Sequence, residues 1–146
     1  MLGKKILSTN NKPEIILNPD GIITIRGRSM NGKLYDLSDE IEEWVDKYIG
    51  NPAEITYVDF HLEYFNKANS KVIITLLKKI ESLKLLSKKV VINWYYEEGD
   101  EEILEKGEYF SSELNIPFNF IEIYEALMPD YTTHNMDISG QNVRNS

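Results

Sequence analysis

Three side chains able to bind a metal or move a proton occur at alternate positions of one segment: Asp59, His61 and Glu63. Alternate residues of a β-strand point to the same face, so the three would line one side of a strand, as a metal site or an acid/base pair requires. Asp59 and Glu63 would nevertheless lie about 13 Å apart, too far for one ion with ligand bonds near 2 Å. We therefore predict an exposed polar strand face with no metal and no cofactor, and keep a small metal-assisted or acid/base enzyme as the alternative.

Sequence motifs of the large enzyme classes are absent. The segment 27–32, Gly-Arg-Ser-Met-Asn-Gly, lacks the Gly-Lys-Ser/Thr ending of a phosphate-binding loop. The two histidines, His61 and His134, show neither the spacing of a Ser-His-Asp triad nor a nucleophile elbow. The acidic run 97–108 lacks the alternating Asp/Asn pattern of a calcium loop and suits the start of a helix, where the dipole favours acids. These observations favour a protein that is not an enzyme.

Composition narrows the classes of partner. The chain of 146 residues has no cysteine, which excludes disulfides, a thiolate nucleophile and cysteine zinc sites. Its net charge of -8 argues against nucleic acid and anionic membranes as partners, because phosphate binding depends on concentrated Lys and Arg. There is no apolar run near the roughly 20 residues that span a bilayer, and no stretch of signal-peptide type at the N-terminus. We expect a cytoplasmic protein that binds another protein.

The hydrophobic periodicity predicts strands and helices in alternation after an initial hairpin. Pro19-Asp20-Gly21 separates two β-rich runs and is typical of a hairpin turn. Apolar residues recur at helical spacing in three segments and alternate in the long strand. The predicted strands cover 14–18, 22–26, 55–65, 89–96 and 118–124. The predicted helices run from near Asp36 or Ser38 to 49, from about 69 to 86, and from 99 to about 114.

This order predicts the α/β class. We expect a mixed sheet of about five strands, in which an N-terminal β-hairpin is followed by right-handed β-α crossovers with three main helices. Residues 1–128 are predicted to form one domain. Residues 129–146 are polar and without periodicity, and are predicted to form a mobile tail.

The turn between the long strand and the second main helix is the strongest candidate for a working surface. A helix start offers unsatisfied N–H groups and the positive end of the helix dipole, so a phosphorylated hydroxyl there would alter both the helix and a docked partner. Simple capping of the helix by Asn69 or Ser70 is the alternative.

Three separated motifs resemble the SiaC family of bacterial regulatory phosphoproteins. They are Ile41-Glu42-Glu43-Trp44, the segment 62–71 and the segment 91–101, and the resemblance extends over about 13–125. It implies a STAS-like fold, similar to anti-anti-sigma domains, and a partner-switching role in biofilm and cyclic-di-GMP signalling. A kinase and a PP2C-type phosphatase toggle one hydroxyl in such systems, and in the best-known branch the unphosphorylated form activates a diguanylate cyclase.

The chain departs from the family pattern at the phosphoacceptor. The family has threonine directly after the asparagine of this turn, whereas this sequence has Lys67, which cannot form a phosphoester. Either Ser70 has become the phosphoacceptor, or the protein binds independently of phosphorylation, or it is a paralogue with another partner. Our hypothesis is that Lys67 keeps the domain permanently competent to bind. The predicted partner-binding residues are Asn66, Lys67, Ala68, Asn69, Ser70 and Lys71.

Overall fold

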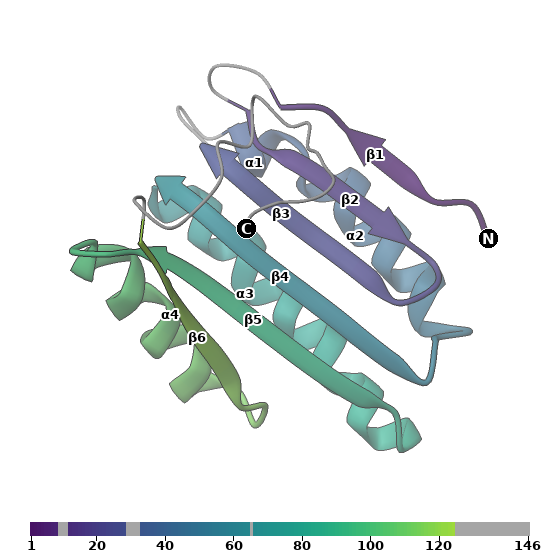
Figure 1. Cartoon of the computed structure of the whole chain (residues 1–146). Helices are drawn as coiled ribbons and strands as arrows, with labels where there is room; N and C mark the ends of the chain where they lie inside the picture. Colours follow the sequence, from purple (N-terminus) through teal and green to yellow (C-terminus); the bar gives the residue numbers. More distant parts are fainter. Residues whose placement is uncertain (9–11, 29–32, 65, 125–146) are drawn as a thin grey trace, which may run out of the picture.

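The computed structural model describes residues 1–8, 12–28, 33–64 and 66–124. Within these ranges one six-stranded sheet carries helices on a single face (Figure 1). The strands are β1 (Lys4–Ile6), β2 (Glu14–Asn18), β3 (Ile22–Arg28), β4 (Ile55–Tyr64), β5 (Lys89–Glu97) and β6 (Phe118–Ile123). The helices are α1 (Lys33–Asp36), α2 (Ser38–Ile49), α3 (Lys67–Glu81), the 3-10 helix η1 (Ser82–Leu86) and α4 (Glu101–Glu113). The predicted α/β class is confirmed.

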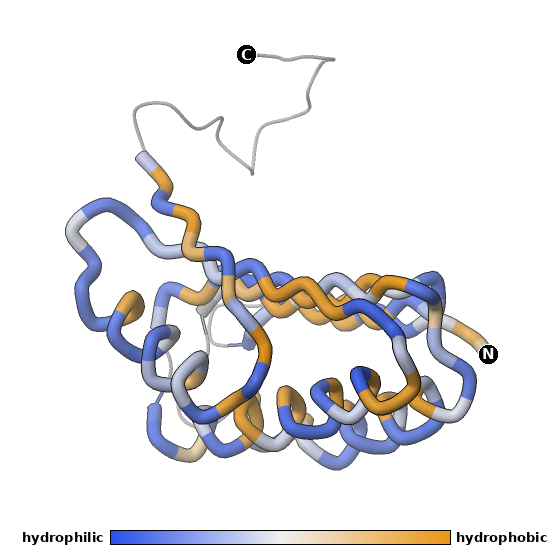
Figure 2. The backbone as a smooth tube through the Cα atoms, turned by 90° about the horizontal axis from the view of Figure 1, so that it is seen from below, coloured by the Kyte–Doolittle hydropathy of each residue, from blue (hydrophilic) through white to orange (hydrophobic). Residues whose placement is uncertain are grey.

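The strands lie side by side in chain order, from β1 to β6. The pairs β1–β2 and β2–β3 are antiparallel, and β3, β4, β5 and β6 are parallel to their neighbours. Because each later strand is added to the same edge by a right-handed crossover, every connecting helix falls on the same face. Figure 2 shows this arrangement with the sheet edge-on and the helices on one side only.

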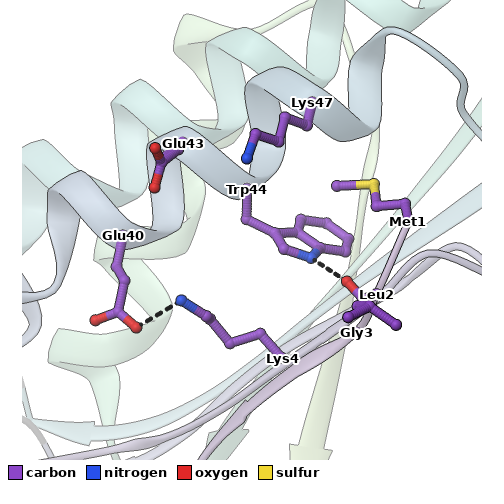
Figure 3. Close-up of a pocket in the computed structure, with 8 residues that line it drawn as sticks. All are labelled: Met1, Leu2, Gly3, Lys4, Glu40, Glu43, Trp44 and Lys47. Atoms are coloured by element: carbon purple, nitrogen blue, oxygen red, sulfur yellow. Dashed lines mark hydrogen bonds and ion pairs between the residues drawn. The ribbon is translucent and has the colours of Figure 1, made fainter.

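The predicted count of about five strands is wrong by one, because β1 was missed. This strand has only three residues and pairs with β2. It is held to α2 by a hydrogen bond from the Trp44 indole nitrogen to the Leu2 carbonyl (3.0 Å) and by the ion pair of Lys4 with Glu40 (2.8 Å) (Figure 3). A pocket of about 430 Å³ lies where the N-terminal segment that contains β1 meets α2. Contacts with a helix far along the chain therefore stabilise a strand that local sequence does not indicate.

The hairpin between β2 and β3 forms as the turn residues predict. The Gly21 N–H donates to the Asn18 carbonyl (2.9 Å), and the Asp20 N–H donates to the Asn18 side-chain oxygen (2.8 Å). Gly21 has φ 105°, a left-handed conformation that a residue with a side chain adopts only with strain. The Gly21 carbonyl then accepts from the Tyr57 N–H (2.7 Å), which links the turn to the start of β4.

The core lies between the sheet and its helices. On β4, Val58, Phe60 and Leu62 are buried and face the helices, while Asp59 and His61 are half-buried on the other face. The predicted alternation of this strand is therefore correct. The other core residues include Ile15, Leu17, Ile23, Ile25, Ile41, Val45, Ile73, Leu77, Ile92 and Trp94.

Helix α4 approaches β5 unusually closely at Gly107. A Cβ atom at this position would lie 2.5 Å from the indole nitrogen of Trp94, well inside van der Waals contact. The same indole nitrogen donates to the Ile103 carbonyl one turn earlier in α4 (2.9 Å), and Trp94 is 1% exposed. The absence of a side chain at Gly107 thus lets the Trp94 ring pack directly on the helix backbone.

None of the helices in the described ranges has the length and apolar character that crossing a bilayer requires. The predicted tail, residues 129–146, lies outside the residues that the structure describes.

Candidate functional site

Helix α3 begins two residues earlier than predicted because Asn66, rather than Asn69 or Ser70, caps it. Asn66 is extended (φ -99°, ψ -175°), and its side-chain oxygen accepts a hydrogen bond from the Asn69 N–H (3.0 Å). This is the standard geometry of an N-cap residue. Lys67 is consequently the first residue of the helix, and its side chain is exposed.

Asn69 belongs to the interior rather than to the surface. It is 0% exposed, and its side-chain oxygen accepts a hydrogen bond from the Tyr35 N–H (3.0 Å). This bond ties the first turn of α3 to α1 and satisfies a backbone donor. A docked protein therefore cannot contact the Asn69 side chain directly. Of the other predicted residues, Lys67 and Lys71 are exposed, and Asn66, Ala68 and Ser70 are half-buried. We call Asn66, Lys67, Ala68, Ser70 and Lys71 the α3 surface.

Ser70 lies where α3 faces α4. Its hydroxyl donates to the Asn66 carbonyl (3.3 Å), and the side chain is half-buried. It lines a groove of about 390 Å³, which we call the α3–α4 groove; the other lining residues are Glu102, Glu105, Lys106, Tyr109 and Phe110. The acidic run of α4 was interpreted from the sequence only as favourable to the helix dipole, and the groove was not predicted.

The first turn of α3 carries the charge that a helix start least favours. Lys67 is exposed and is the first residue of the turn, Lys71 follows at the start of the next turn, and the first turn contains no acidic residue. A cation at this end of a helix costs roughly 0.3–1 kcal/mol against the dipole. Helix α4 has the opposite and favourable arrangement, with Asp100 as its cap and acids in its first turn. Lys67 is therefore not explained by the stability of its own helix.

The polar side chains of β4 do not come together to form a single site. The Asp59 carboxylate accepts a hydrogen bond from the Asn93 amide (2.7 Å), whose oxygen in turn accepts from Asn119 (3.0 Å). His61 lies 3.9 Å from Glu97 and packs against Tyr95 with the ring centres 5.8 Å apart. Over the described residues, no group of three His, Cys, Asp or Glu side chains is placed to hold a metal. Nothing in this geometry favours the alternative enzymatic interpretation.

Burial lowers the pKa of His61 below its ordinary value of 6.5; the nearby Arg26 lowers it further, and Glu63 opposes both effects. The native protein therefore binds this proton less readily than the unfolded chain does. Stability from this source is fully present above the unfolded pKa and is lost as the pH falls through the window between 6.5 and the lowered value.

We expect acid to destabilise the wild type more than a His61→Gln variant. Carboxylates titrate in both proteins, so the difference between their free energies of unfolding isolates the histidine. This difference should shift against the wild type as the pH falls from about 7.5 to about 5. Urea denaturation at several pH values measures it, and a difference independent of pH would contradict the prediction.

Comparison with known proteins places these features in a family. The model of the SiaC family, described as SiaC family regulatory phosphoprotein, matches residues 6–123. The crystal structure of the diguanylate cyclase SiaD in complex with its activator SiaC from Pseudomonas aeruginosa contains a chain with a TM-score of 0.75 and 22% identity, with 82% of this chain and 99% of that one covered.

Two further relatives come from the same organism. The structure of SiaC of Pseudomonas aeruginosa has a TM-score of 0.74 and 22% identity, covering 84% of this chain and 100% of that one. An uncharacterized protein of Pseudomonas aeruginosa is 24% identical over 98 residues, which are 67% of this chain and 78% of the relative. Since the family model spans most of the sequence, the chain belongs to the SiaC family of regulatory phosphoproteins.

Proposed function

We propose that this protein is a cytoplasmic, non-enzymatic regulator that binds and activates a diguanylate cyclase through the α3 surface. The observation that carries the proposal is the exposed Lys67 at the first position of α3, where the family resemblance places the phosphorylated threonine. Further support comes from a structural relative that was crystallised with a diguanylate cyclase as its activator.

The topology favours binding over catalysis. Open α/β sheets form ligand crevices at points where the strand order reverses. Strands β3 to β6 follow one another without reversal and have all their helices on one face, so no such crevice is created. The α3 surface instead presents a row of side chains beside a shallow groove, a shape that suits another protein.

The same surface supports a permanently active state. Lys67 cannot carry a phosphoester, so the roughly −2 charge that would repel a partner cannot be placed there. Ser70 is a poor substitute, because its hydroxyl bonds to the Asn66 carbonyl and lies in a groove with Glu102 and Glu105, whose carboxylates would oppose a phosphate dianion. We therefore propose that binding is controlled by the amount of protein and not by the kinase and phosphatase.

Reversing the charge of Lys67 tests the function directly. Wild type should bind the diguanylate cyclase from the same genome and raise its rate of cyclic-di-GMP synthesis, and Lys67→Glu should bind it about tenfold or more weakly. Glutamate at a helix start is favourable, so the variant should be at least as stable as wild type. Calorimetry measures the affinity and thermal denaturation the stability.

A matched control is Lys78→Glu, which makes the same charge change at an exposed position near the other end of α3. It should retain near wild-type affinity. Equal affinity of Lys67→Glu and wild type would place the interface elsewhere, and no binding by wild type would reject the cyclase as partner.

A further inference from the structure

We propose that the α3–α4 groove receives a segment of the partner protein that presents a basic side chain beside an apolar one. The inference rests on the proposed function and adds the chemistry of the partner to it. The groove is lined by side chains of three kinds: the Ser70 hydroxyl, the charged Glu102, Glu105 and Lys106, and the aromatic Tyr109 and Phe110.

The groove exists because the two helices pack on different parts of the sheet. Helix α3 lies behind β4 and contacts α1 and α2, whereas α4 lies behind the β5–β6 edge and contacts β4, β5 and β6 (Figure 1). The close approach of Gly107 to Trp94 holds α4 down on β5. The groove of about 390 Å³ is left between the start of α3 and the length of α4 from Glu102 to Phe110.

Acidic residues outnumber the basic one on the α4 wall of the groove, with Glu102 and Glu105 against Lys106. Glu102 and Glu105 are three residues apart, so they project from the same face of α4, and both are exposed. Among the ion pairs between described residues, none includes either carboxylate, although Lys106 lines the same groove. Glu105 lies beyond the first turn of α4, where the helix dipole no longer rewards an acid. Two such carboxylates are complementary to a lysine or arginine of a partner.

The floor of the groove provides the apolar half of the contact. Phe110 is buried, while Tyr109 beside it is 59% exposed, a large aromatic surface to leave in water. Tyrosine is enriched at protein interfaces, and aromatic rings attract both aliphatic side chains and cations. A basic side chain that reaches Glu102 and Glu105 would therefore lay its apolar stem, or an apolar neighbour, against Tyr109.

The groove is continuous with the α3 surface. Ser70 lines the groove, and Lys67 lies one helical turn before it. A single partner segment can thus contact both, with its basic residue on the α4 side and an acidic or polar residue toward Lys67. In this arrangement the opposite charges of the two helix starts meet opposite charges of one partner segment.

The test compares the affinity of a variant with reversed charges in the groove with that of a variant with reversed charges elsewhere on α4. The groove variant is Glu102→Lys with Glu105→Lys; the control variant is Glu108→Lys with Glu113→Lys, exposed positions of the same helix outside the groove. Both change the net charge equally, so long-range attraction changes equally. Calorimetry with the diguanylate cyclase should show at least about a tenfold loss of affinity for the groove variant and less than about threefold for the control.

Circular dichroism confirms that each variant folds. The single variant Glu105→Gln should show a smaller loss of affinity in the same direction.

A second arm makes the result independent of the cyclase. The probe is a fluorescent helical peptide with leucine and lysine along one face, together with the same peptide carrying glutamate for lysine. The lysine peptide should bind wild type and the control variant more tightly than the groove variant, with affinity that falls as salt rises. Equal affinity of the groove and control variants for the cyclase overturns the inference. If wild type does not bind the cyclase, the proposed function fails, and equal binding of the lysine peptide to both variants then overturns the groove inference as well.

Discussion

Lys67→Thr is expected to convert a chain that accepts no phosphate at this position into one that accepts a single phosphate. Threonine would restore the hydroxyl that the family resemblance places directly after Asn66, at the exposed first position of α3. The positive end of the helix dipole favours the phosphate once it is attached. The variant is incubated with ATP and the kinase of the same genome that is expected to modify SiaC-family proteins. Intact-mass analysis then measures the phosphate taken up.

Phosphorylated Lys67→Thr should then bind the diguanylate cyclase at least about tenfold more weakly than its unphosphorylated form, because a charge near −2 enters the interface. Lys67→Val, which has the shape of threonine without the hydroxyl, should take up no phosphate. Stoichiometric phosphate on Ser70 of the wild type would contradict the proposal of a permanently active state. Lys67→Thr with Ser70→Ala distinguishes the two positions, since it should still be modified.

Gly107→Ala is expected to destabilise the protein, because the added methyl group has no room beside Trp94. The new Cβ would lie 2.5–2.7 Å from three atoms of the Trp94 ring, which is buried and cannot turn aside. Overpacking of this kind costs about 1–3 kcal/mol, and the better helix propensity of alanine returns only about 1 kcal/mol. The melting temperature should fall by several degrees in a thermal denaturation scan.

Two comparisons show whether the Trp94 contact is the cause. Gly50→Ala is the control: Gly50 is exposed and has ordinary helical angles, so its substitution should change the stability little. In the double variant Gly107→Ala with Trp94→Phe, the smaller ring gives the methyl group room, so the combined loss should be less than the sum of the single losses. Strict additivity would show that Gly107 matters for another reason.

Much of the fold follows from local pattern. The strand β2 has the predicted bounds, and β4, β5 and β6 each differ from their predictions by one residue. The helix α2 begins at Ser38, the later of the two starts predicted for it, and ends before Gly50 as predicted. These elements combine clear periodicity with strong turn signals such as Pro19-Asp20-Gly21 and Gly50-Asn51-Pro52. In contrast, β1 depends on Trp44, which lies 42 residues after the carbonyl that it holds.

The site was less predictable because it depends on contacts between distant segments. Asn66, Asn69 and Ser70 are all good capping residues, and sequence alone does not say which one caps α3. The buried Asn69 side chain accepts a hydrogen bond from the N–H of Tyr35, 34 residues earlier. The α3–α4 groove depends on how deeply α4 sits on β5, and that depth is set by Gly107 and Trp94. The hydrophobic periodicity of a single segment does not indicate how closely a helix packs on a strand.

The agreement between strand order and chain order has a consequence for how the protein is made. A sheet whose strands are added in sequence can grow as the ribosome releases the chain, because each strand from β4 onward meets an edge that has already emerged. Each strand pairs with the strand that precedes it in the chain, so closing each loop costs little entropy. Folding should therefore be fast for a parallel sheet. The last strand, β6, completes the sheet only when the domain has left the exit tunnel, and until then β5 is an unprotected edge.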